Sequence, residues 1–439
     1  MRRRTNRLFA AVLLAAAAGG AARAQDAPWG RVALFGNVTQ MTNTDGSHST
    51  LGQWSAALTL HSASNTNGGF EYGVDFRGSQ YPGVQRDNLE SLYDAYVGGR
   101  TNGGVLGVRI GQMWINEIGS LGAVGGGYLD LRQKDPSSIG RFRLGLFGGV
   151  EPKVQQIGYY SQVKKYGGFV ALDGEDARES VLGYVQVRNG SLLERSVVVL
   201  NNYIPIGRNF SIYQAGEYDI APPAGQGSSG LNYFMINARW QASRVIEIQG
   251  LYHYGLSIDA RTLSDDILHG RPIDPQLAEG FLFESAGGRI TFTIAPTVRF
   301  YAGYATEKRN KTDPALGRIT AGLFASDLFH TGLDLSVSEN RYHRTTGQGD
   351  DNAVYVSLGR SIGPQVYLTA EYSTSVSFLQ FTNSGGVIVT TQPSFRRYAL
   401  SGVANLNRWF SLLLTLEHIT GETRADEESR ALFGIAYRF

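Results

Sequence analysis

The chain has 439 residues, of which 42% are hydrophobic, 18% are charged, 56 are glycine and none is cysteine. Soluble proteins carry roughly 25% charged residues and ~7% glycine, so this chain is poor in charge and rich in glycine. The absence of cysteine excludes disulfide scaffolds, thiolate metal sites, covalent haem attachment and a cysteine nucleophile. An aromatic content of 11% argues against disorder.

Residues 1–24 have the features of a secretory signal peptide. The opening MRRRTNR is basic, Leu8–Ala18 is an apolar run, and Ala22–Ala24 offers a cleavage site with small residues. The apolar run is too short for a membrane helix, which needs about 20 residues. We expect residues 25–439 to form the mature chain, with 35 basic and 38 acidic side chains and a net charge of −3. Nothing in this balance points to a nucleic-acid partner.

The rest of the chain alternates between apolar and polar residues at every second position, which places successive side chains on opposite faces of a strand. Soluble β-sandwiches also alternate, but their apolar face is a mainly aliphatic core. Here the second face is polar, charged or glycine over some 400 residues. That pattern is typical of a membrane barrel with lipid outside and water inside. The clearest runs are Trp54–His61, Phe70–Arg77, Val298–Ala305, Leu333–Ser338, Val366–Ser373, Phe410–Glu417 and Ala431–Phe439.

Two classes of connector separate the predicted strands. Short ones rich in glycine, asparagine or proline include Pro205–Arg208 and Ala295–Thr297, and longer polar ones include Ser257–Glu284 and Ser377–Ser394. Short turns at one end and longer loops at the other are the arrangement of outer-membrane barrels. Our strand count is 22, and we predict an all-β fold: one transmembrane, antiparallel, up-and-down β-barrel of 18–22 strands spanning residues 25–439.

The last strand resembles the assembly signal of Gram-negative outer-membrane proteins. Phe439 is the terminal aromatic, Tyr437 lies two residues before it, and Ile435 and Phe433 continue the apolar positions. The resemblance implies secretion to the outer membrane, recognition by the barrel-assembly machinery, and contact with outer-membrane lipids and lipopolysaccharide.

A second resemblance is to a hairpin of general porins. It covers Ala95–Gly99 and Gly103–Gln112, about 20 residues. In porins the next extracellular loop folds into the barrel and narrows it, and the matching segment here is Trp114–Gly125. This segment is unusually apolar for an exposed loop, and Glu117 is its only acid. A surface loop or an extra strand is the alternative interpretation.

Charged residues opposite the apolar face are predicted to face the lumen, because Arg or Lys on the lipid side would cost about 2–4 kcal/mol at the midplane. They could form structural ion pairs between strands, or charged clusters that orient polar solutes. Inward tyrosines such as Tyr213 and Tyr355 could stack on sugar rings or fill the interior. The pore-lining candidates are Arg109, Glu117, Arg143, Arg188, Arg239, Glu247, Arg299, Arg318, Glu371, Arg397 and Glu417.

The sequence predicts a channel for the passive passage of small hydrophilic solutes. The alternative is an outer-membrane barrel that serves as partner of a polysaccharide export system. We expect no enzyme, metal or cofactor, because the seven histidines show no metal spacing and no nucleophile elbow, P-loop or dinucleotide fingerprint is present. A plugged transporter of about 22 strands would need an N-terminal plug domain, and the strand pattern already begins by Val32.

Overall fold

The structure is a computed structural model, described here for residues 28–62, 68–84, 86–174, 178–221, 229–311, 314–344, 351–377, 379–382, 388–391, 393–423 and 426–439. The predicted signal peptide, residues 1–24, lies outside the described residues. No helix in the described part is long and apolar enough to cross a membrane.

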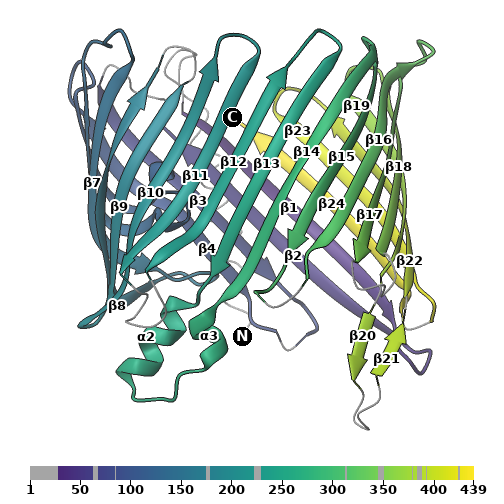
Figure 1. Cartoon of the computed structure of the whole chain (residues 1–439), viewed down its shortest axis with the longest axis horizontal. Helices are drawn as coiled ribbons and strands as arrows, with labels where there is room; N and C mark the ends of the chain where they lie inside the picture. Colours follow the sequence, from purple (N-terminus) through teal and green to yellow (C-terminus); the bar gives the residue numbers. More distant parts are fainter. Residues whose placement is uncertain are drawn as a thin grey trace.

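Within the described residues, 22 strands form one closed antiparallel sheet (Figure 1). Each strand pairs with its neighbours along the chain, and β1 pairs with β24 to close the ring. The first strands are β1 (Trp29–Thr42), β2 (His48–His61), β3 (Gly69–Gln80), β4 (Leu89–Arg100), β5 (Leu106–Trp114), β6 (Ala123–Arg132), β7 (Arg141–Pro152), β8 (Tyr159–Asp173), β9 (Glu179–Asn189), β10 (Leu192–Ile206), β11 (Phe210–Ala221) and β12 (Gly230–Gln241). The others are β13 (Ile246–Ser257), β14 (Phe281–Ala295), β15 (Val298–Lys308), β16 (Leu316–Leu328), β17 (Leu333–Arg344), β18 (Asp351–Ile362), β19 (Val366–Val376), β22 (Ser394–Asn405), β23 (Phe410–Thr420) and β24 (Glu428–Arg438). The all-β barrel prediction is confirmed, at the upper end of the predicted range.

The two ends of the barrel differ in their connections. At the end that holds Phe439, tight turns join the strands, as in the β10–β11 and β14–β15 connections (Figure 1). The other end carries longer connections with their own secondary structure: η2 (Asn116–Leu121), α2 (Ala260–Leu268), α3 (Pro275–Glu279) and the hairpin β20 (Leu379–Thr382) with β21 (Ile388–Thr391). We call these the turn end and the loop end. The two predicted classes of connector therefore separate in space.

The outer face of the barrel is an apolar belt. Residues that pair across neighbouring strands point to the same face, and one such row contains Leu400, Leu416 and Ala431. Leu400 is 53% exposed, and Leu414 and Phe433 on the same face are 51% and 43% exposed. Apolar surface on this scale does not face water in a monomeric soluble protein, but it matches a hydrocarbon environment.

The strand that closes the ring carries the residues predicted as the assembly signal. Phe433, Ile435, Tyr437 and Phe439 all lie on the outer face of the chain segment that pairs with β1. The Phe439 ring covers Gly30, where an added Cβ would lie 2.3 Å from it, and the Phe433 ring covers Gly36 in the same way. The sequence thus matches an aromatic residue to a glycine twice along the seam. Recognition by the assembly machinery stays a prediction.

Candidate functional site

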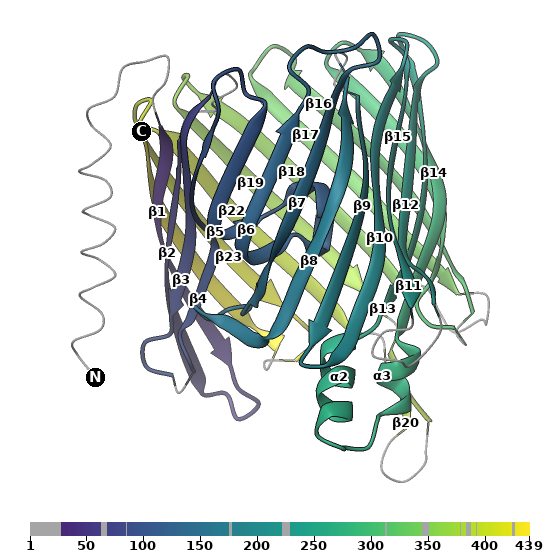
Figure 2. The same ribbon diagram turned by 90° about the vertical axis from the view of Figure 1, so that its left-hand side faces the viewer.

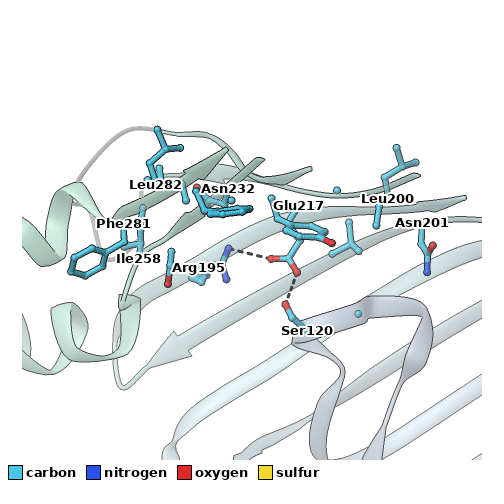
Figure 3. A pocket seen from close by; sticks show the side chains of 18 of the residues that line it. Ser120, Arg195, Leu200, Asn201, Glu217, Asn232, Ile258, Phe281 and Leu282 are labelled. Atoms are coloured by element: carbon cyan, nitrogen blue, oxygen red, sulfur yellow. Dashed lines mark hydrogen bonds and ion pairs between the residues drawn. The ribbon is translucent and has the colours of Figure 1, made fainter. Parts of the chain in front are cut away.

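The connection between β5 and β6 folds into the barrel, as predicted for Trp114–Gly125. Its short helix η2 contacts β8, β9 and β10 from the inside (Figure 2). Ile118 of η2 is fully buried and lies against Gly183 of β9. At its tip, the Ser120 hydroxyl donates a hydrogen bond to Glu217 of β11 (Figure 3). The segment therefore lies inside the lumen and narrows it.

The inner wall beneath η2 is apolar. Val181, Val185 and Val187 of β9 are at most 2% exposed, and Val197 of β10 is completely buried. They form one cluster with Ile118 and further apolar residues of the loop and of β7 and β8. Since η2 shields these strands from water, their inward side chains can be apolar while their outward side chains, such as Leu182, face the belt. This side of the barrel is filled.

Arg188 is the one pore-lining candidate that the structure places on the outer face. It alternates with the inward Val187 and pairs in register with Lys164, on the side of Leu182. One of its Nη atoms donates to the Ser191 carbonyl oxygen at 2.9 Å. Arg188 lies opposite the valines of this strand, and the rule that charged residues opposite an apolar face point to the lumen therefore predicted an inward position. Because η2 covers the valines from inside, the inward assignment of Arg188 is wrong.

On the filled side, ion pairs hold three further candidates, Arg109, Glu117 and Arg143. Arg109 Nε lies 2.8 Å from a Glu71 carboxylate oxygen, and its guanidinium lies 5.1 Å from the ring centre of Tyr96. Arg143 bonds Glu117 of η2 at 2.6 Å and Asp173 of β8 at 2.6 Å. Arg109, Glu117 and Arg143 thus brace the filled side and are not free charges of a pore.

Sequence reasoning missed some partners in this buried network. Arg100 joins Glu71 at 3.3 Å to Asp130, and all three residues are at most 7% exposed. Glu71 lies within the alternating run Phe70–Arg77, whereas Arg100 and Asp130 lie outside the runs given above. Their signal was available, since both lie on inward positions of β4 and β6.

Helix α2 covers the filled side at the loop end. Arg261 bonds Glu194 through two nitrogens, at 2.7 and 3.0 Å, and lies 3.0 Å from Glu151. Ser264 accepts from the amide of Asn189 at 2.9 Å, and Leu263 is fully buried. Burial alone would lower the pKa of Arg261, but hydrogen bonds and charges from Glu194 and Glu151 raise it above its ordinary value. Arg261 is therefore a permanent cation that fastens α2 to the wall.

The remaining inner wall, from β12 round to β24, is polar. Seven candidates lie on it: Arg239, Glu247, Arg299, Arg318, Glu371, Arg397 and Glu417. Around them the inward positions are mostly small or hydroxylated, including Ser336, Ser338, Ser357, Thr369, Ser373, Ser401 and Thr415. Neither η2 nor α2 packs on these strands, because both lie on the β8–β10 side.

Several charges on the polar wall are paired along the hydrogen-bonding direction of the sheet. Arg397 bridges Glu371 at 2.9 Å and Glu417 at 3.2 Å. Arg239 lies 2.6 Å from Glu247 although its side chain is 58% exposed. Arg299 has neither an ion pair nor a hydrogen bond from its side chain among the described residues. The polar wall thus carries ion pairs between strands and, at Arg299, a cation without a side-chain partner among the described residues.

A cavity of about 780 Å³ lies between the tip of η2 and the inner faces of β10 to β14. Figure 3 shows Ser120, Arg195 and Glu217 meeting at its floor, with Asn201 on the same side and Leu200 pointing away. Arg195 lies 3.6 Å from Glu217 and 3.1 Å from Asp219. We call this space the chamber. No group of three or more metal-ligating side chains occurs in the described part of the chain.

No family model and no curated protein matches the chain. Among solved structures it is similar to OccAB2 of Acinetobacter baumannii, with 8% identity, a TM-score of 0.46, and coverage of 94% of this chain and 98% of that one. It is also similar to OpdQ of Pseudomonas aeruginosa, with 10% identity, a TM-score of 0.45, and coverage of 94% of this chain and 97% of that one. An anion-selective porin from Comamonas acidovorans shares 11% identity with the chain, with a TM-score of 0.35 and coverage of 94% of this chain and 100% of that one.

Proposed function

We propose that this protein is a porin-like channel in the outer membrane of a Gram-negative bacterium, through which small hydrophilic solutes pass by diffusion. The observation that supports it is the contrast between the two faces of β12–β24. Outside, Leu400, Leu414 and Phe433 are exposed and apolar. Inside, the same strands present serine, threonine and charged side chains that neither η2 nor α2 covers. Uncovered polar groups of this kind need water.

The inner loop supplies the constriction of the proposed channel. It stands on a dry cluster of valines and is held at its tip by the bond from Ser120 to Glu217 and at its base by Glu117 with Arg143. Because the loop is fixed at both places, the distance between η2 and the polar wall is set. The narrowest part of the water path lies between them. In this role Arg299, Arg318 and Arg397 line the path, while Arg109 and Arg143 support the loop.

The proposal extends to assembly and location, and the outer face supports both. The apolar belt fits the hydrocarbon layer, and Phe433, Ile435 and Tyr437 of the closing strand lie on its outer face, at positions on which the resemblance to outer-membrane proteins rests. We therefore include the barrel-assembly machinery, outer-membrane lipids and lipopolysaccharide as partners in the proposal. Passive diffusion needs no catalytic group, and we propose none.

Ion conductance of the purified protein in planar lipid bilayers tests the proposal. We expect steady ohmic current steps, and uptake of small sugars or amino acids by proteoliposomes in a swelling assay. Heat-denatured protein from the same preparation is the control and should give neither. A folded protein without conductance or swelling would contradict the proposal and favour a barrel that opens only with an export partner.

A further inference from the structure

The wall of the chamber is an aromatic surface. Tyr213, Tyr233 and Phe283 point into the lumen from β11, β12 and β14, since each occupies an inward position of the register. The His253 ring connects two of them, with its centre 5.5 Å from that of Tyr233 and 5.2 Å from that of Phe283. The chamber therefore offers flat apolar faces inside an otherwise polar lumen.

Gly255 leaves a hollow within this surface. It lies between Tyr233 and Phe283 in the register and has no side chain to fill the gap. A Cβ added to Gly255 would meet no atom nearer than 3.8 Å. The cavity volume of about 780 Å³ falls within the roughly 300–1,000 Å³ of ordinary small-molecule sites. A ring-shaped molecule can therefore lie in the hollow and contact the rings on both sides.

The ionic groups of the chamber floor are already paired with one another, and Arg309, which also lines the chamber, lies 4.0 Å from Glu307. Glu217 accepts from Ser120 and faces Arg195 at 3.6 Å. The fully buried Asp219 carboxylate binds Arg195 at 3.1 Å and also accepts from the Asn232 amide. A cationic ligand would have to displace Arg195 from these carboxylates, and an anionic ligand would have to displace the carboxylates from Arg195. In either case a charged side chain of the protein loses its partner, and an unpaired charge that is shielded from water costs free energy.

Uncharged polar groups complete the lining. The Asn201 amide, the Tyr213 hydroxyl and the Ser257 hydroxyl line the chamber, and none of them bonds another side chain or backbone group among the described residues. They supply donors and acceptors of the kind that bind hydroxyl groups. Their combination with the aromatic wall suits a molecule with one apolar face and a rim of hydroxyls.

We propose that the chamber binds the ring of a neutral saccharide during its passage through the channel. The C–H face of the sugar stacks on Tyr233 and Phe283 over Gly255, and its hydroxyls bond Asn201 and Ser257. This inference rests on the proposed channel function and adds the class of solute. The paired charges disfavour sugars that carry a charge of either sign, so the site selects neutral rings from charged ones of similar size.

The test is block of the ion current by maltose, with glucuronate and glucosamine as anionic and cationic ring-shaped comparison solutes. We expect maltose to reduce the current of the wild-type channel with saturation, and the two charged solutes to reduce it without saturation. Tyr233→Ala removes half of the stacking surface and should raise the half-blocking maltose concentration by about tenfold. The matched control is Tyr355→Ala on β18, an inward tyrosine far along the sheet, which should leave that concentration unchanged.

A second variant keeps the inference testable if Tyr233→Ala does not fold. Gly255→Leu fills the hollow without removing an aromatic ring, and it should abolish saturable block by maltose. Folding of each variant is measured by the shift in mobility between unheated and heated protein on denaturing gels. Saturable block by glucuronate or glucosamine in place of maltose would overturn the inference, as would maltose block unchanged in both variants. A conducting channel without maltose block overturns this inference alone, whereas the absence of conductance contradicts the channel itself.

Discussion

Ile118 at the centre of η2 lies directly over Gly183 of β9, with its Cδ1 atom 2.7 Å from the position that a Cβ on residue 183 would occupy. No side chain larger than hydrogen leaves room for Ile118 in its present place. The glycine therefore fixes how closely the inner loop approaches the wall, and with it the space left on the other side of the loop.

Gly183→Val should push η2 away from β9 and narrow the water path, so single-channel conductance should fall. Combining it with Ile118→Ala returns the lost space and should restore most of the conductance. Ile118→Ala alone leaves a cavity, which costs about 2–5 kcal/mol in a packed core, and should increase current noise instead. Single-channel conductance and current noise of the three variants, recorded in lipid bilayers, test this prediction. Equal conductance in all of them would contradict the location of η2 at the narrowest zone.

Ser120→Ala should loosen the tip of the loop. It removes a hydrogen bond to the Glu217 carboxylate, and bonds to charged groups contribute about 1.5–3 kcal/mol. We expect more frequent transitions between conductance levels in single-channel traces, with little change in the mean. Ser357→Ala, at an inward position of the polar wall, is the control and should keep the wild-type noise. Quiet traces from Ser120→Ala would show that the valine cluster alone holds the loop.

The ion pair between Arg143 and Glu117 should contribute more to stability than the exposed pair between Arg239 and Glu247. The first pair has side chains 10% and 16% exposed, and the second has an arginine 58% exposed. Double-mutant cycles with Arg→Met and Glu→Gln, measured by urea unfolding of the folded barrel, should give a coupling of about 1–3 kcal/mol for the first. For the second we expect about 0.2–1 kcal/mol. The reverse order would contradict the supporting role of Arg143.

Gly30→Val and deletion of Phe439 should both hinder closure of the barrel. A side chain at position 30 would collide with the Phe439 ring, and the same two residues exchange backbone hydrogen bonds of 2.9 and 3.0 Å at the seam. Both variants should lower the amount of folded protein in outer-membrane fractions and raise degraded periplasmic material. Gly250→Val is the matched control, because position 250 also faces outward and an added Cβ there meets nothing within 4 Å. Normal levels of Gly30→Val would argue against the ring-on-glycine seam.

Arg299→Glu should shift ion selectivity toward cations. Arg299 has no side-chain partner among the described residues, so reversing its charge changes the field in the lumen without breaking an ion pair. Reversal potentials across a salt gradient should move, and Arg299→Gln should produce about half the shift because it changes the charge by half as much. The shift should fade as salt rises to 1 M, where the Debye length is ~3 Å. A shift independent of salt would point to altered pore shape.

The sequence by itself determined the class of fold and, for most strands, which side chains point into the barrel. Alternation with period two in most of the strands predicts a closed barrel for a chain that must satisfy its backbone in lipid, and the two classes of connector predicted that the long loops gather at one end. The inward positions of Arg239, Glu371 and Arg397 followed from the same parity. Each of these inferences depends only on neighbours along the chain and across one strand pair.

Only the tertiary structure decided what fills the interior. On β9 both faces are apolar, so periodicity could not tell which face meets lipid and which meets the inner loop, and Arg188 was assigned to the wrong side. The choice is made by Ile118, which lies more than 60 residues away along the chain and covers Val185 and Val187 from inside. A contact between distant segments leaves no periodic trace in either of them. For this reason the chamber, with Ser120 meeting Glu217, became visible only in three dimensions.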